Sequence, residues 1–273
     1  MLKLIDKLPE LDKKLIDLLE SLDKLDWQKQ TVAKKWKVKD VAAHLLDGNI
    51  RVLSNLRDRH QGESPRINSY QDLLDYLNRI NAEWVQAMKR VSPEMLIDLL
   101  KHTGRPYYEY YASLDPYAKA EYSVAWAGEQ ESTNWMHIAR EYTEKFLHQQ
   151  QIRDATNRQG IMTQEYYLPF LEVCMYALPY TLRDSQAENG SVLKMQITGE
   201  VNEQWFVHYN GAQWERIEPT ADVQPITAIS IDYYASWKLF SKSLRPKDLV
   251  DKIKIEGNQE LGKKAVEMVS FMA

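Results

Sequence analysis

Histidine and glutamate side chains at two places in the sequence have the residue types and the spacing of a metal site. Glu144 and His148 lie four residues apart in a segment with helical character, so their side chains project from one helical face, one turn apart. His44 lies in a separate helical segment, between the apolar Val41 and Leu45. Because facing helices can bring their ligands together inside a bundle, the sequence predicts a divalent-metal site formed by His44, Glu144 and His148.

The same residue types also have plainer interpretations. A glutamate four residues before a histidine often forms a weak ion pair on a solvated helix face. A single histidine beside an apolar stripe is often a partly buried core residue. His137 and Glu141 extend the polar stripe of the second helix, whereas His60, His102 and His208 lie in surroundings that indicate no special role. Spacing alone therefore leaves the metal site as one interpretation among several.

The first half of the chain has the apolar spacing of helices, which would position the three ligands. Helices are predicted over residues 9–25 and 38–57, after a cap at Ser69, from Ser92 and Pro93 onward, and from a cap at Ser132 to about Asp154. Residues 103–130 interrupt this pattern with several tyrosines and two prolines. We expect a loop there, which either serves function or covers the core with its aromatic side chains.

The second half of the chain changes to a mixture of strands and helices. Alternating apolar residues predict strands over residues 193–197, 205–209, 228–231 and 253–255. Asn210-Gly211 predicts a hairpin turn in which both residues adopt positive φ. Helices are predicted over residues 163–178, around Trp237 and over residues 261–269. The chain should therefore form a helical domain over residues 1–158 and a smaller α+β domain over residues 159–273.

Composition narrows the class of protein. The 273 residues carry a formal net charge of -4, which gives no indication of a nucleic-acid partner. The single cysteine, Cys174, allows neither an internal disulfide nor a cysteine-based metal site. No apolar run has the length of a membrane span or the pattern of a signal peptide, and the common nucleotide-binding, serine-hydrolase and H-E-x-x-H motifs do not occur. We therefore expect a cytoplasmic protein without a membrane partner.

Two segments resemble the signatures of the mycothiol-dependent maleylpyruvate isomerase family, which belongs to the DinB-like metal-binding four-helix bundles. Residues 36–48, WKVKDVAAHLLDG, are similar to the first signature, W-x-V-x-D-x-x-x-H-L, and residues 144–155, EKFLHQQQIRDA, to the second. Residues 193–211 and 255–273 resemble the family's sterol-carrier-like C-terminal domain. The resemblance covers nearly the whole chain. It implies an α+β fold: a DinB-like four-helix bundle followed by a smaller sterol-carrier-like α/β domain.

The resemblance also assigns roles to residues. The family's metal ligands map onto His44, Glu144 and His148. Three protein ligands leave a coordination position open, as catalytic sites do, and this set suits zinc first but also nickel, manganese or iron. The family's C-terminal domain lends a basic residue to the active site, and Arg216 and Arg245 are the candidates here.

The implied activity is that of an isomerase or an S-transferase that uses a low-molecular-weight thiol, such as mycothiol or bacillithiol, on a small electrophile that can carry a carboxylate. The alternative is a non-enzymatic, metal-containing protein that binds a small molecule, in which His137 would supply a fourth ligand. One departure from the family is visible, because Gln151 stands where the family often has an acid. The sequence leaves the thiol, the substrate and the oligomeric state open.

Overall fold

The structure, a computed structural model, describes residues 3–63, 65–218 and 223–271. The chain divides into two compact units, of which the first comprises Met1–Lys119 and Thr133–Met162 and the second comprises Ala120–Ser132 and Thr163–Ala273. The predicted domain boundary follows residue 158, and in the structure the first unit ends at Met162. Residues 120–132, which lie within the predicted first domain, belong to the second unit, where Trp126 stacks on Phe271.

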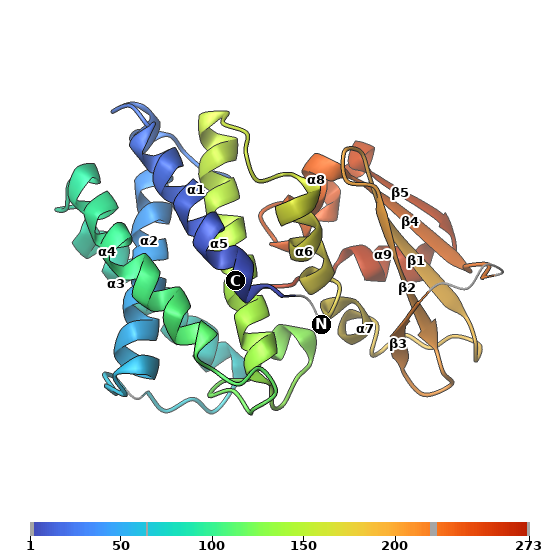
Figure 1. Ribbon diagram of the computed structural model, residues 1–273. Helices are drawn as coiled ribbons and strands as arrows, with labels where there is room; N and C mark the ends of the chain where they lie inside the picture. Colours follow the sequence, from blue (N-terminus) through green and yellow to red (C-terminus); the bar gives the residue numbers. More distant parts are fainter. Residues whose placement is uncertain (1–2, 64, 219–222, 272–273) are drawn as a thin grey trace. The chain divides into compact units, whose positions relative to one another are not determined.

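The first unit is a helical bundle (Figure 1). Its main helices are α1 (Leu8–Glu20), α2 (Val38–Arg51), α3 (Tyr70–Met88), α4 (Pro93–Ala112) and α5 (Asn134–Thr156). Two of the predicted helix starts are confirmed, because the side chains of Ser69 and Ser92 accept hydrogen bonds from the backbone N–H groups of Asp72 and Met95. These bonds satisfy donors that a helix leaves unpaired at its first turn.

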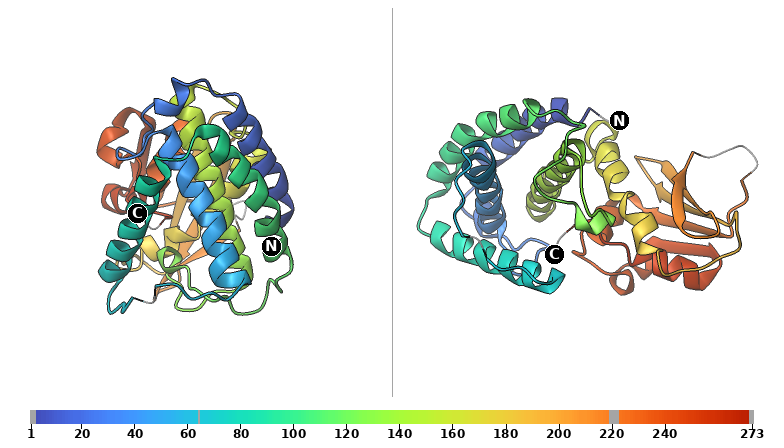
Figure 2. Two further views of the ribbon diagram at one scale, coloured as in Figure 1. Left: turned by 90° about the vertical axis from the view of Figure 1, so that its left-hand side faces the viewer. Right: turned by 90° about the horizontal axis from the view of Figure 1, so that it is seen from below.

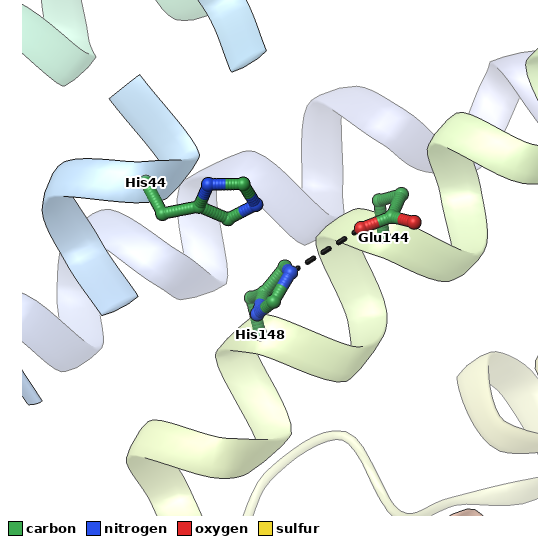
Figure 3. A group of neighbouring side chains, drawn as sticks. All are labelled: His44, Glu144 and His148. Carbon is green, nitrogen blue, oxygen red and sulfur yellow. Dashed lines mark ion pairs between the residues drawn. The ribbon is translucent and has the colours of Figure 1, made fainter. Parts of the chain in front are cut away.

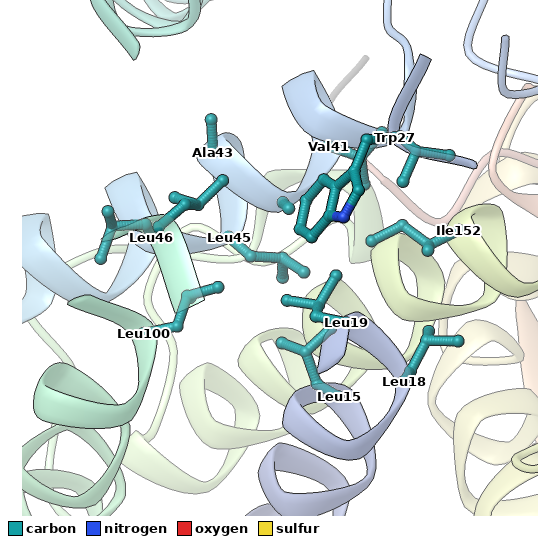
Figure 4. Close-up of a cluster of buried hydrophobic side chains, with 13 residues drawn as sticks. Leu15, Leu18, Leu19, Trp27, Val41, Ala43, Leu45, Leu46, Leu100 and Ile152 are labelled. Carbon is teal, nitrogen blue, oxygen red and sulfur yellow. The ribbon is translucent and has the colours of Figure 1, made fainter. Parts of the chain in front are cut away.

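One cluster of buried apolar side chains joins α1, α2, α4 and α5 (Figure 4). Its members are Leu15, Leu18, Leu19, Trp27, Val38, Val41, Ala42, Ala43, Leu45, Leu46, Leu96, Leu100 and Ile152. Burying one leucine side chain stabilises the fold by roughly 1.5–3 kcal/mol. The cluster therefore holds the backbone around His44 firmly, because apolar residues on both sides of that histidine belong to it.

The tyrosine-rich region differs from the prediction. Residues 103–112 are not a loop, because α4 continues through Pro106 to Ala112. A proline inside a helix removes a hydrogen bond and costs about 3 kcal/mol. Tyr107 and Tyr111 lie four residues apart on the same face of α4 and are 2% and 0% exposed, so their packing offsets that cost.

The start of α5 is shifted by one residue from the prediction. Thr133, not Ser132, is the residue before the first helical turn, and its side chain accepts a hydrogen bond from the backbone of Met136. The hydroxyl of Ser132 instead accepts from the backbone N–H of Val124 and contacts Glu129. Either residue type suits the position, and the competing partners of Ser132 decide between them.

The second unit contains a mixed sheet whose strands, among the described residues, follow the order β3-β2-β1-β4-β5. The strands are β1 (Val192–Thr198), β2 (Glu203–Tyr209), β3 (Trp214–Ile217), β4 (Thr227–Asp232) and β5 (Ile253–Gly257). Strands β1 and β4 pair in parallel, and the other pairs of neighbouring strands named here are antiparallel. The helices of this unit are α6 (Gln164–Cys174), α7 (Ala177–Thr181), α8 (Tyr233–Phe240) and α9 (Gln259–Val266). A helical bundle followed by a mixed sheet with helices confirms the predicted α+β class.

The hairpin between β2 and β3 is confirmed, but its turn is longer than predicted. Four residues, 210–213, connect the strands, and of the first two only Gly211 has positive φ, at 92°. The side chain of Asn210 accepts hydrogen bonds from the backbone N–H groups of Ala212 and Gln213. Asn210 therefore closes the loop through its side chain, and its own backbone need not enter the left-handed region.

Within the described part of the chain, no helix has the combination of length and apolar character that crossing a membrane requires.

The end of β5 yields a test of the sheet. Gly257 has φ 79°, and a Cβ atom there would lie 2.1 Å from the carbonyl oxygen of Ile226. Gly257→Ala should therefore lower the free energy of unfolding by about 1–3 kcal/mol more than Gly190→Ala, because Gly190 has φ 86° but open space around its Cα. Denaturant unfolding of both variants measures the difference, and equal losses would show that the contact with Ile226 is unimportant.

Candidate metal centre

The site depends on how α2 lies against α5. The two helices run side by side (Figure 2), and a buried lysine of α5 connects them. Lys145 Nζ contacts Asn49 Oδ1 and lies 3.5 Å from the carbonyl oxygen of Leu45. Because Leu45 follows His44 and Lys145 follows Glu144, these contacts set the register in which the two helices present their ligand residues.

The three predicted ligands point toward one another from these two helices (Figure 3). One ligand atom from each of His44, Glu144 and His148 can be chosen so that all three lie within 4.8 Å of one another. His148 Nε2 is 3.2 Å from Glu144 Oε2, and the rings of His44 and His148 are 4.6 Å apart between centroids. Among the described residues, no other group of three histidine, cysteine or acidic side chains offers ligand atoms this close.

Gln151 fixes the orientation of the His148 ring. The distance from His148 Nδ1 to Gln151 Oε1 is 2.9 Å. Since an amide oxygen can only accept, His148 donates from Nδ1 and keeps the lone pair of Nε2 for a ligand bond. A partner of this kind on the far side of the ring is usual for metal-binding histidines. Gln151 therefore supplies here the acceptor that an acid would provide at the same position.

His44 has the environment of a neutral imidazole. Burial, aided by the charges of His148, Arg51 and Lys145, lowers the pKa of His44 well below its ordinary value. Its Nδ1 atom is buried and has no hydrogen-bond partner in the described part of the chain. The ring of Trp36 lies 4.7 Å from that of His44 and 6.0 Å from that of His148. Two imidazole nitrogens and one carboxylate oxygen are a donor set that fits a divalent ion.

A second polar cluster occupies the next turn of α5 toward its N-terminus. Glu141 Oε1 accepts hydrogen bonds from Arg140 at 2.6 and 3.2 Å, and Glu141 Oε2 accepts one from the Tyr107 hydroxyl at 2.7 Å. Burial raises the pKa of Glu141, but the charge of Arg140 and the other partners outweigh it and lower that pKa to about 2. Burial, followed by the charge of Arg140, lowers the pKa of His137 to about 4. His137 is engaged in this cluster and is not one of the three converging ligands.

The two arginines that the resemblance singled out lie in the second unit and are already paired there. Arg216, in β3, donates to Glu172 Oε2 at 2.9 Å and lies over the ring of Tyr176. Arg245 contacts the carboxylate of Glu267. Their assignment to the active site stays a prediction.

Sequence reasoning missed Lys145 and Arg140, although both belong to the predicted helix. Charged residues that are mostly buried are uncommon unless they are paired. The pairing in this case involves long-range partners such as Asn49 or side-chain geometry within α5, and neither leaves a periodic signal in the sequence.

His137 should make stability depend on pH. Its folded-state pKa of about 4 lies below the ordinary value of 6.5, so the unfolded chain binds a proton first as the pH falls. For metal-free protein, the free energy of unfolding should therefore decrease between about pH 6.5 and pH 4, with His137 contributing on the order of 3 kcal/mol. His137→Gln should reduce this decrease, whereas variation of the exposed His102 should not. Denaturant unfolding at several pH values measures it, and equal slopes in all three proteins would contradict the assignment.

Comparisons with known proteins agree with the fold. A family model described as the mycothiol maleylpyruvate isomerase N-terminal domain matches residues 8–153, which is more than half of the chain. The crystal structures of the mycothiol-dependent maleylpyruvate isomerase and of a histidine-to-alanine mutant of it match with TM-scores of 0.57 and 0.56. Each is 10% identical, and each match covers 93% of this chain and 92% of the other.

At that identity, the structural likeness establishes the fold alone. A third match, to the sterol carrier protein-2 like-3 of Aedes aegypti, has 20% identity and a TM-score of 0.26, and covers 36% of this chain and 93% of the other. That score is too low to support the sterol-carrier likeness of the second unit, which stays a prediction. A comparison with curated proteins finds no match. The family model is decisive: the chain belongs to the family of the mycothiol maleylpyruvate isomerase N-terminal domain.

Proposed function

We propose that the chain is a divalent-metal-dependent enzyme that uses a low-molecular-weight thiol either to isomerise a small electrophile or to form a lasting C–S bond with it. The observation that supports this proposal most is the convergence of His44, Glu144 and His148 from two helices. These residues would hold the ion, with zinc as the first choice and nickel, manganese or iron as alternatives. A metal ion bound there would lower the pKa of a thiol and so supply a thiolate at neutral pH.

The residues around the ligands would prepare the site for that chemistry. Gln151 holds His148 in the tautomer that presents Nε2. Burial keeps His44 neutral at physiological pH, so its ring need not lose a proton before it binds an ion. The half-buried Trp36 ring lies beside both histidines, and we assign to it an apolar wall that excludes water from one side of the site.

Two reactions begin with the same attack by sulfur. In an isomerase, the thiolate adds to an activated cis double bond, the new single bond rotates, and the electron pair of the C–S bond returns to sulfur as the trans product forms. In an S-transferase, the C–S bond stays. The name of the structural relative, a maleylpyruvate isomerase, favours the first reaction and a substrate with carboxylates. Arg216 and Arg245 are the predicted partners of such carboxylates.

The rival function is a non-enzymatic, metal-containing protein that binds a small molecule. A fourth protein ligand would favour it, because closed sites are usually structural. The residue expected for that role, His137, instead contacts Arg140 through Nε2 and lies 3.7 Å from Glu141 Oε1. These contacts favour an open site, and therefore the enzymatic proposal.

The metal site is tested by metal content. Protein purified without added metal should carry about one divalent ion per chain, since three ligands of this kind bind metals tightly, and His44→Ala should lose it. His102→Ala is the matched control, because His102 is exposed and lies outside the site. Mass spectrometry of the elements measures the content, with circular dichroism to confirm folding. A wild-type protein that binds no divalent ion would refute the proposal.

The role of Gln151 gives a second test. Gln151→Leu should lower metal affinity by roughly 10–100-fold, because His148 would lose the acceptor that orients its ring. Gln151→Glu keeps an acceptor and should bind the ion at least as well as wild type. Competition with a chromophoric chelator measures both affinities. If Gln151→Leu binds metal like wild type, the hydrogen bond to His148 has no role in the site.

A further inference from the structure

Arg140 lies in line with two of the metal ligands on α5. Arg140, Glu144 and His148 are spaced four residues apart, so they form one row along the same helical face, each about one turn from the next. Burial opposes the charge of Arg140, but the carboxylate of Glu141, with a smaller contribution from Glu144, outweighs it and raises the pKa of Arg140. A permanent positive charge therefore lies one turn from a metal ligand.

The guanidinium of Arg140 is held along one edge. Nε and Nη2 donate to Glu141 Oε1, and Nη2 also contacts His137 Nε2. A guanidinium has no acceptor, so His137 Nε2 must accept this bond, and the proton of a neutral His137 ring is on Nδ1. Glu141 is held in turn by the hydroxyl of Tyr107. The orientation of Arg140 is thus fixed by two partners, Glu141 and His137, before any ligand binds.

Two hydrogen-bond donors near Glu141 have no partner among the described residues. The hydrogen bonds of Arg140 involve Nε and Nη2, and Nη1 has no partner among the residues that the structure describes. The Arg140 side chain is 21% exposed. The hydroxyl of Tyr111 is buried and also has no partner in the described part of the chain, and its ring lies 5.6 Å from that of His137. The neighbouring cation, Lys145, is instead engaged by Asn49.

We infer that Arg140 is a specificity-determining residue that binds a carboxylate of a molecule whose reacting end lies at His44, Glu144 and His148. This inference rests on the proposed function and assigns recognition of a carboxylate to a residue of the first unit. The guanidinium of Arg140 is the strongest hydrogen-bond donor on this face of α5, because its bonds to a carboxylate are charge-assisted. Because Glu141 and His137 already hold the side chain, little rotamer entropy is lost when a carboxylate binds. The carboxylate can belong to the thiol or to the electrophile.

The cobalt-loaded protein tests the inference, because a thiolate bound to cobalt(II) gives a charge-transfer band. In the first arm, the protein is titrated with 3-mercaptopropionate and with its neutral analogue, 3-mercaptopropionamide. In the second arm, protein saturated with 2-mercaptoethanol is titrated with maleate and with its neutral analogue, maleamide. The measured quantity in each arm is the ratio of the affinities for the anion and for the amide.

The variants separate recognition from folding. Arg140→Gln removes the guanidinium, and the double variant Arg140→Gln with Glu141→Gln also removes the carboxylate that would be left unpaired. Arg105→Gln is the matched control, because Arg105 is exposed, belongs to the same unit and has a similar partner, Glu109, at 2.6 Å. Cobalt affinity is measured for every variant, since a merely structural role of Arg140 would change it together with all ligand affinities.

Wild type should prefer the anion by at least about 10-fold in one arm, and that arm identifies the source of the carboxylate. Both Arg140 variants should lose the preference while they bind cobalt and the neutral ligands as wild type does, and Arg105→Gln should keep it. A wild type without preference in either arm, or a preference that survives in the Arg140 variants, overturns the inference alone. If cobalt binds but no thiol produces the band, the proposed function fails as well.

Discussion

The buried ammonium group of Lys145 is the constraint on which the metal centre depends. A buried lysine charge is costly unless it is paired or solvated by polar groups. Lys145 meets this cost with the side-chain oxygen of Asn49, the carbonyl of Leu45 and the ring of Tyr107 at 4.4 Å. Two of these partners belong to α2 and one to α4. In the register of α5 against α2 and α4 that satisfies all three, Glu144 and His148 face His44.

Two adjacent faces of α5 have different roles, one in anchoring the helix and one in presenting the candidate ligands. Lys145, Gln149 and Arg153 bind other parts of the bundle, the latter two through hydrogen bonds to the backbone of α1. Glu144 and His148 instead pair with each other, His148 also bonds Gln151, and Arg140 is held by His137 and Glu141. The helix is therefore anchored along one face and can present ligands and a cation along the next. Membership of the family agrees with this arrangement, whereas the reaction depends on residues that a likeness of fold does not specify.

The sequence predicted the features that depend on local periodicity. Glu144 and His148 lie on one helical face in any tertiary arrangement. Leu193, Met195 and Ile197 alternate with polar residues, as a half-buried strand requires. All three of these strand residues are fully buried in the structure. Placing His44 beside the other ligands required the resemblance as well, because no periodic signal states which helices face each other.

The predictions that were wrong, and a residue that was missed, share one physical reason. A helix through Pro106 is stabilised by Tyr107 and Tyr111, whose packing partners come from other parts of the bundle, such as Glu141. The loop after β2 is set by the side chain of Asn210 rather than by its backbone. Arg140 was not singled out from the sequence because its partners, His137 and Glu141, are ordinary neighbours on a helix. In each case a specific side-chain contact outweighed the average preference of the local sequence.

The most direct measurement is an anomalous-scattering map from crystals of the zinc-loaded protein, recorded at the zinc edge. We expect one strong peak in the bundle, bonded to His44, Glu144 and His148, with at least one coordination position taken by no protein atom. A peak elsewhere, or a fourth bond from a protein side chain such as His137, would contradict the central claim that these three residues form an open metal site.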